Sequence, residues 1–364
     1  MRLAFKVAPT SLRNDPALDA GRAIATVLTR AWAETPLPLD PGAVASSTHR
    51  LLVQSGAGAL YWRRIAAQEG APSLVYPLRD HYRSLVLASK VRALQLAETV
   101  AYLRKHEIES LLIKGWAIAR SYPHPALRPY GDLDLCVADA DYVRSGELLA
   151  QRSAALTPVE LHPASGLLGD LRYGDLFPRS TVHCLDGTEI RIPSPEQHLR
   201  LLALHYLKHG GWRPLWLCDL AVAMEQRPPD FDWDRCFHGR SDLTAWLRAL
   251  LHLSAELLGA RLSGTPLAEE EMLIPRWLAP EMLRTWGRGL GSSVSMPASA
   301  FFSPAGIRTG GLREALQRSW RNNLQAAFEL GLPPGDFPQL PLRVAASAMQ
   351  LPRLIARASR SNDR

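Results

Sequence analysis

The chain has 364 residues, of which 47% are apolar and 21% charged, a balance that excludes a disordered protein and leaves room for two or three domains. A net charge of +7 suits an anionic ligand, but the arginines are spread along the chain and form no basic block typical of nucleic-acid binding. No stretch reaches the ~18 uninterrupted apolar residues of a membrane span, and the first residues lack the apolar run of a signal peptide, so we expect a cytoplasmic protein. Four widely spaced cysteines argue against a zinc site or a disulfide framework: Cys136, Cys184, Cys218 and Cys236.

The first part of the chain is predicted to be helical. Residues 17–35 have helical character and are followed by proline-rich joints. A long amphipathic helix is predicted over residues 84–106, with Leu87, Val91 and Leu94 near one stripe. This helix leads into a short apolar strand that begins at Leu111.

Two carboxylates follow on a second apolar strand. Asp132 and Asp134 alternate with Leu133 and Leu135. Side chains alternate between the faces of a strand, so the two carboxylates point the same way and converge. Taken alone, such a pair is ordinarily solvated surface, but in an apolar strand unpaired carboxylates cost several kcal/mol. The pattern therefore favours a divalent metal site, the arrangement that phosphoryl or nucleotidyl transfer requires.

An anion site is predicted beside the metal site, where Lys114-Gly115 ends the first strand. Glycine lets the backbone approach a ligand closely, and Lys114 supplies a cation. The amides of Trp116 and Ala117, at the start of the next helix, are expected to point at a phosphate.

These motifs resemble a known family. Lys-Gly, a short helix with Tyr122, and then Arg128 and Gly131-Asp-Leu-Asp-Leu resemble the uncharacterised nucleotidyltransferase family of the DNA polymerase β-like nucleotidyltransferase superfamily. The similarity extends over about residues 80–260, including segments 159–162, 195–212, 216–220 and 231–234. Many superfamily members have Gly-Ser where this chain has Lys-Gly, so Lys114 is expected to replace a serine contact to the triphosphate.

The resemblance also implies a third carboxylate on a neighbouring strand. Glu160 matches the family position, although Asp186 and Glu189 are alternatives, and an ordinary exposed strand glutamate is an equally good interpretation of Glu160. His162 shares a strand face with Glu160 and is either an outer partner of the metal ligands or a packed histidine.

Helices are predicted to dominate after Pro195, clearest over residues 196–209, 215–226 and 242–258. His198, His205 and His209 can share a helix face, but with no carboxylate to complete a metal site, packed histidines are the preferred interpretation. Lys208 or Arg213 is expected to reach the triphosphate. Trp212 or Trp216 either stacks on the base or packs in the core. Asp219 either orients Lys208 or caps a buried turn.

The predicted fold is α+β: a nucleotidyltransferase-type mixed-sheet core at residues 86–195, N-terminal helices at 1–85 and a C-terminal helical domain at 196–364. The basic C-terminal tail receives no function, and the oligomeric state stays open.

The expected activity is Mg²⁺-dependent nucleotidyl transfer, with Mn²⁺ as a substitute ion and a nucleoside triphosphate such as ATP as co-substrate. A peptide, sugar or small-molecule hydroxyl, as in natural-product or polysaccharide tailoring, is the first choice of acceptor. A toxin-like transferase acting on tRNA and an inert nucleotide- or partner-binding protein are the alternatives. The expected catalytic and metal-binding residues are Asp132, Asp134 and Glu160, and the expected nucleotide-binding residues are Lys114, Gly115, Arg128, Lys208, Trp212 and Arg213.

Overall fold

The structure is a computed structural model of the chain. It describes residues 15–40, 42, 44–66, 75–152, 157–166, 173–271, 274–289, 322–338, 341–343 and 345–346. Most of the basic C-terminal tail lies outside these residues. No helix in the described ranges is long and apolar enough to cross a membrane.

A mixed five-stranded sheet forms the centre of the α/β part. Its strands are β1 (Ser110–Leu112), β2 (Leu133–Val137), β3 (Val159–Pro163), β4 (Thr181–Leu185) and β5 (Thr188–Ile192), in the spatial order β3-β2-β1-β5-β4. β2 runs antiparallel to β1 and parallel to β3, while β1 runs parallel to β5. β4 and β5 form a hairpin, in which Asp186 and Gly187 both have positive φ, as a two-residue Asp-Gly turn requires. The mixed sheet with its many helices confirms the predicted α+β class.

The two faces of the sheet contribute to different hydrophobic cores. Leu133, Leu135 and Val137 of β2 pack in a smaller core, together with residues of α4 (Val75–Lys105) and α5 (Trp116–Ala119). Cys136 belongs to the large core, which also contains most of the helical region. Because side chains alternate along β2, Asp134 lies on the same face as Cys136 and is turned toward that helical region.

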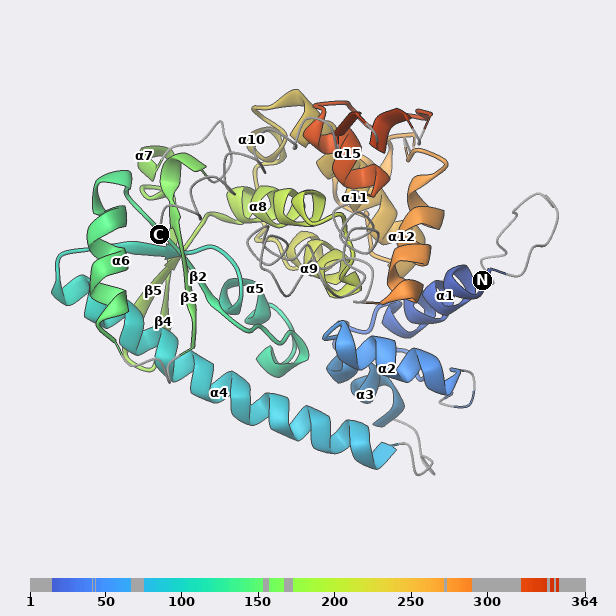
Figure 1. The fold of residues 1–364 in the computed structure, drawn as a ribbon, viewed down its shortest axis with the longest axis horizontal. Coiled ribbons are helices and arrows are strands. Elements are labelled where there is room, and N and C mark those ends of the chain that lie inside the picture. Colours follow the sequence, from blue (N-terminus) through green and yellow to red (C-terminus); the bar gives the residue numbers. More distant parts are fainter. Residues whose placement is uncertain are drawn as a thin grey trace, which may run out of the picture.

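The long predicted helix exists as α4 and begins earlier than expected, at Val75. The predicted stripe does not face the core: Leu87, Val91 and Leu94 are 67%, 51% and 52% exposed. The buried residues are on the opposite side of the helix, at Leu96, Val100 and Leu103. In Figure 1, α4 runs from the sheet to α3, so only its second half lies along the sheet.

The remaining long helices form the helical region, in which α8 and α9 lie nearest the sheet and α1, α2, α3 and α12 lie further from it (Figure 1). Those before the sheet are α1 (Pro16–Leu28), α2 (Ser46–Gln54) and α3 (Gly58–Ala66). Those after the sheet are α8 (Pro195–Lys208), α9 (Pro214–Glu225), α10 (Trp233–Cys236), α11 (Ser241–Leu258), α12 (Leu278–Arg288) and α15 (Asn323–Glu329). Short helices lie within and around the sheet region: η2 (Pro125–Leu127), η3 (Asp139–Asp141), α6 (Tyr142–Ala150), η4 (Ala164–Gly166) and α7 (Tyr173–Leu176), with η5 (Pro266–Ala268) further on.

The N-terminal and C-terminal helices share one core. α1 packs against α12 and α11, and buried residues from α1, α2 and α3 join those of α8, α9 and α11. The boundaries at residues 85 and 195 stay a prediction, but the first and third predicted domains are packed together.

Local sequence explains how α8 and α9 are placed beside the sheet. The Ser194 side chain caps α8 by accepting from the Gln197 amide, and Pro195 occupies the first turn. Gly210 and Gly211 follow α8 with φ of 65° and 61°, and a Cβ at Gly211 would meet the Tyr206 ring. This tight connection brings the end of α8 against the start of α9.

Candidate active site

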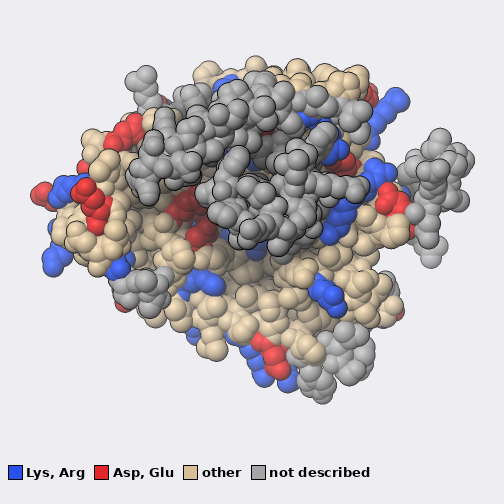
Figure 2. All heavy atoms as spheres, viewed as in Figure 1, with Lys and Arg blue, Asp and Glu red and all other residues tan. Residues whose placement is uncertain are grey.

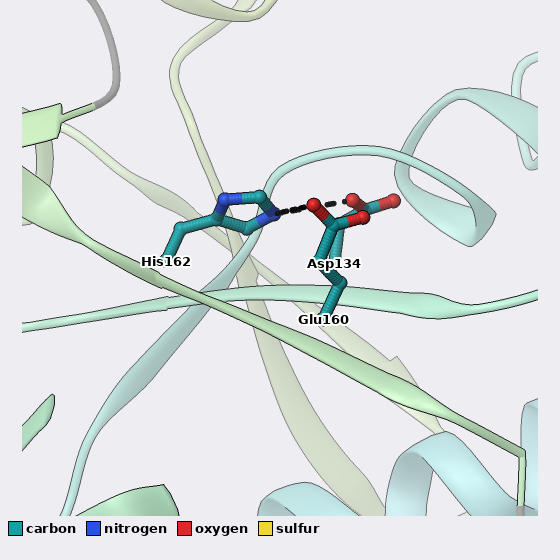
Figure 3. A group of neighbouring side chains, drawn as sticks. All are labelled: Asp134, Glu160 and His162. Atoms are coloured by element: carbon teal, nitrogen blue, oxygen red, sulfur yellow. Dashed lines mark hydrogen bonds and ion pairs between the residues drawn. The ribbon is translucent and has the colours of Figure 1, made fainter. Parts of the chain in front are cut away.

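The parallel pairing of β2 and β3 assembles the centre of the site. Asp134 on β2 is paired with Glu160 on β3, and His162 follows two residues later on the same face. His162 Nε2 lies 3.3 Å from Asp134 Oδ1 and 3.7 Å from Glu160 Oε1 (Figure 3). Within the described ranges, these three residues form the one cluster with the spacing of metal ligands, all within 4.8 Å of one another.

Lys114 joins this cluster from the end of β1. The antiparallel pairing of β1 with β2 continues to the hydrogen bond from the Ile113 amide to the Asp134 carbonyl, and Lys114 follows. Its Nζ lies 2.7 Å from Asp134 Oδ1, and the Asp134 side chain is buried. Burial by itself would raise the pKa of Asp134, but the hydrogen bond to His162 and the Lys114 ammonium outweigh it, and the pKa falls below 3.8. Asp134 is therefore a buried carboxylate held in its charged form.

Asp132 has the opposite electrostatic character. It lies in a bend directly before β2, where the sequence predicted it within the strand, and it is half-buried. Burial and the neighbouring charge of Asp134 raise its pKa above 3.8. It is near enough to Asp134 to feel its charge but is outside the cluster of Asp134, Glu160 and His162.

The turn after Lys114 is built as predicted, but one of the two expected phosphate-binding amides is occupied. Gly115 has φ of 63°, and a Cβ there would approach the Tyr130 ring to 3.3 Å. The Ala117 amide donates to the Lys114 carbonyl at 3.2 Å. The short helix α5 closes its first turn with this bond, and the contact of the Ala117 amide with a phosphate stays a prediction.

Arg128 is engaged by a carboxylate from the helical region. Its Nε and Nη2 both donate to Asp219, the shortest contact being 2.7 Å, and Tyr122 donates to the same carboxylate at 2.8 Å. Arg128, Asp219 and Tyr122 are all buried. The idea that Asp219 orients Lys208 is wrong, because Asp219 is occupied by these two partners from the segment between β1 and β2.

The end of α8 brings a histidine to Lys114 that the sequence did not connect with it. His205 Nδ1 lies 3.4 Å from Lys114 Nζ, and burial followed by the Lys114 charge depresses the pKa of His205 well below 6.5. The His205 ring packs edge-on against Trp216, which in turn contacts Trp212. A neutral imidazole thus separates the ammonium from an aromatic cluster.

The other residues predicted to bind nucleotide differ in their exposure and in their hydrogen bonds. Lys208 is exposed at the end of α8, Trp212 is half-buried and Trp216 is buried. Arg213 donates to the backbone carbonyls of Ser55 and Pro129, at 2.7 and 3.4 Å.

Histidines and acids that the sequence also considered are placed apart from the cluster. His198 is buried, and burial lowers its pKa to about 3, as expected for a packed neutral histidine. Glu189 lies on β5, which β1 separates from β2, and Asp186 lies in the β4–β5 turn. Sheet order therefore brings Glu160, and neither of these two acids, to Asp134.

Comparison with known proteins finds a family similarity for the part of the chain that carries the first half of this site. Residues 46–156 match the model of the family described as uncharacterised nucleotidyltransferase, which confirms the predicted family for this segment. The segment contains Lys114, Asp132 and Asp134 and ends before Glu160. This segment of the chain is thus similar to the uncharacterised nucleotidyltransferase family.

One solved structure is similar to about half of the chain. It is an antigenic nucleotidyltransferase-like protein from Paracoccidioides brasiliensis, with 16% identity, a TM-score of 0.38 and coverage of 48% of this chain and 94% of its own. No curated protein matches the chain.

Proposed function

We propose that the protein is a metal-dependent nucleotidyltransferase that moves a nucleoside monophosphate from a nucleoside triphosphate to a hydroxyl group. The observation that carries this proposal is the buried, charged Asp134, with Glu160 beside it on β3 and Lys114 2.7 Å away. A buried carboxylate that touches a cation and faces a second carboxylate is suited to a second, divalent cation and to the phosphates that such an ion accompanies.

The donor atoms fit a divalent metal. Asp134 and Glu160 offer oxygens on one face of the sheet, and Asp132 lies next to them, before β2. Mg²⁺ or Mn²⁺ bound there would neutralise phosphate charge and polarise the reacting phosphoryl group.

The protein's own groups would then have distinct roles. Lys114 exchanges its contact with Asp134 for one with a phosphate oxygen, and His205 holds the ammonium from the other side. Glu160, whose side chain is 56% exposed, is accessible to an acceptor hydroxyl and to solvent. Asp132, with its raised pKa, is the stronger base of the two aspartates.

The transfer step follows from these roles. The acceptor oxygen attacks the α-phosphorus, the bond from that phosphorus to the bridging oxygen breaks, and pyrophosphate leaves with the electron pair. The hydroxyl proton passes to Glu160 or Asp132 and then to solvent. Positioning and electrostatic stabilisation supply most of the acceleration.

The wall formed by α8 and α9 is the proposed base-binding side. Trp212 is half-buried in the connection between α8 and α9 and offers an aromatic surface, and Lys208 is exposed at the end of α8. Arg128 and Arg213 stay candidates for nucleotide binding, but their contacts with Asp219 and with backbone carbonyls support an indirect role, in which they fix the loop that carries Asp132.

A small hydroxyl acceptor, such as a peptide or sugar, agrees better with the surface than tRNA does. On the face shown in Figure 2, the described Lys and Arg side chains are scattered among acidic and neutral ones and form no continuous stripe. A phosphate backbone requires several such contacts in a row.

The test is incubation with each α-labelled triphosphate, Mg²⁺ or Mn²⁺, and panels of hydroxyl peptides, sugars and bulk tRNA, with products read by mass. A gain of one nucleotide mass that depends on Asp134 supports the proposal. Glu160→Gln should lose transfer, while Glu189→Gln, a matched change on β5, should retain it. Release of pyrophosphate with no labelled adduct on any acceptor or on the protein itself would contradict the proposed transfer.

A further inference from the structure

The ligand cluster at the proposed site includes a nitrogen donor. His162 directs Nε2 at the two carboxylates and not away from them (Figure 3). Nucleotide chemistry with Mg²⁺ needs only oxygen donors. The placement of an imidazole between two carboxylates therefore bears on which ion the site accepts.

We propose that His162 is a direct metal ligand through Nε2, and that the site binds a first-row transition ion such as Mn²⁺ in preference to Mg²⁺. The proposal rests on the proposed function for its role in transfer, but the ligand set can be tested without any nucleotide.

The distances fit three ligands of one ion. Metal–ligand bonds of about 2.0–2.2 Å place neighbouring ligand atoms about 3 Å apart. His162 Nε2 lies 3.3 Å from Asp134 Oδ1 and 3.7 Å from Glu160 Oε1, and the ligand atoms of all three residues lie within 4.8 Å of one another, so the side chains need only approach one another further when an ion binds. This is within the reach of small side-chain rotations.

The backbone fixes the three residues relative to one another. Asp134 is paired with Glu160, and His162 with Cys136, in an unbroken parallel ladder between β2 and β3. Asp134 is 3% exposed, and His162 is intermediate. The carboxylate that anchors the ion is therefore rigid, and the two β3 ligands approach it from the more open side.

Ligand chemistry then separates the ions. Mg²⁺ is hard, binds oxygen and gives up water reluctantly, whereas imidazole suits transition ions, whose affinity for nitrogen ligands is higher. Replacing one oxygen ligand by Nε2 therefore favours Mn²⁺ over Mg²⁺, relative to a site with carboxylates alone.

The experiment uses Mn²⁺ alone with the full chain and measures binding and nitrogen coupling by electron paramagnetic resonance. The wild type should show ¹⁴N coupling to bound Mn²⁺, which His162→Gln should lose together with at least about 10-fold in Mn²⁺ affinity. Mg²⁺ affinity, measured by competition, should change much less. His183→Gln, a matched change on β4 outside the cluster, should behave as the wild type.

The other outcomes decide against the inference. Retained ¹⁴N coupling in His162→Gln, or a wild type that binds Mn²⁺ without nitrogen coupling, would remove His162 from the ligands. An equal loss of Mn²⁺ and Mg²⁺ affinity would overturn the proposed preference for Mn²⁺. Circular dichroism and melting without metal identify a variant that has simply lost its fold, in which case His162→Asn is substituted. Nucleotidyl transfer with no nitrogen coupling would support the proposed function and contradict His162 as a ligand. Nitrogen coupling without transfer would support His162 as a ligand and contradict the proposed function.

Discussion

The Lys114 ammonium lies 2.7 Å from Asp134 Oδ1, on the carboxylate that the proposed metal ion would also use. In the metal-free protein, Lys114 is thus the cation that compensates a buried negative charge. In the proposed mechanism, binding of a divalent ion and a triphosphate would release this contact, so Lys114 would link protein stability to substrate binding.

Replacement of each aspartate by asparagine should change the stability of the protein in opposite directions. The folded pKa of Asp134 is lowered, so this group contributes stability that is present above pH 3.8 and is lost as the pH falls through the folded pKa. Asp134→Asn should therefore lose about 1–3 kcal/mol of unfolding free energy at pH 7, because Lys114 loses its partner, with a smaller loss near pH 3.

Asp132→Asn should leave stability at pH 7 unchanged or higher. Its folded pKa is raised, so its favourable contribution exists only below pH 3.8 and disappears as the pH rises through the folded pKa. Urea unfolding of both variants at pH 7 and pH 3 measures the contrast, and both should lose transfer. Equal stabilisation by the two changes would show that repulsion between the aspartates outweighs the Lys114 contact.

Lys114 and His205 should act as one unit on the triphosphate. Lys114→Ala should weaken triphosphate binding by roughly 10- to 150-fold, the equivalent of a charge-assisted contact of about 1.5–3 kcal/mol. His205→Ala should have a smaller effect, mainly on KM, because it only positions the ammonium.

A double-mutant cycle tests this coupling. In the Lys114→Ala background, His205→Ala should cause little further loss. His252→Ala, a buried histidine on α11, is the control for general loss of helix packing. Additive losses from the two changes would mean that His205 acts on the ligand by a route other than Lys114.

The Arg128–Asp219 pair should contribute mainly to the stability of the fold and less to triphosphate binding. Removing one partner leaves a buried charge, so Arg128→Ala or Asp219→Ala should each cost about 3–5 kcal/mol of unfolding free energy. Arg128→Met with Asp219→Leu should recover much of this loss, because the apolar pair leaves no charge unpaired. If the double variant is stable and has lost triphosphate affinity, Arg128 has a phosphate role of its own. Unchanged affinity restricts Arg128 to fixing the loop.

The salt dependence of tRNA binding separates the two acceptor classes. A tRNA acceptor would make many phosphate contacts, and its affinity would fall steeply between 50 and 200 mM salt, by about 10³-fold or more for six contacts. We expect weak tRNA binding with no transfer to a tRNA end. Filter binding across a salt series measures the slope, and steep, saturable binding with nucleotide transfer would establish the tRNA alternative.

The sequence by itself determined the local parts of the site. Alternation along β2 sets the face on which Asp134 lies, and only a residue such as Gly115 accommodates the positive φ of the turn after Lys114. The helix α8 likewise follows from its Ser194 cap and Pro195. These features depend on neighbours within a few residues, so the sequence pattern contains them.

The tertiary structure decided which distant residues meet. The parallel β2–β3 pairing brings Glu160 and His162 to Asp134, and the packing of α9 gives Arg128 a partner 91 residues away. The sequence also did not determine which side of α4 packs against the core, because apolar residues occur on both sides of the helix, at Leu94 and at Leu96. Strand order and helix packing arise from the burial of whole faces, a property of the entire chain that no local spacing encodes.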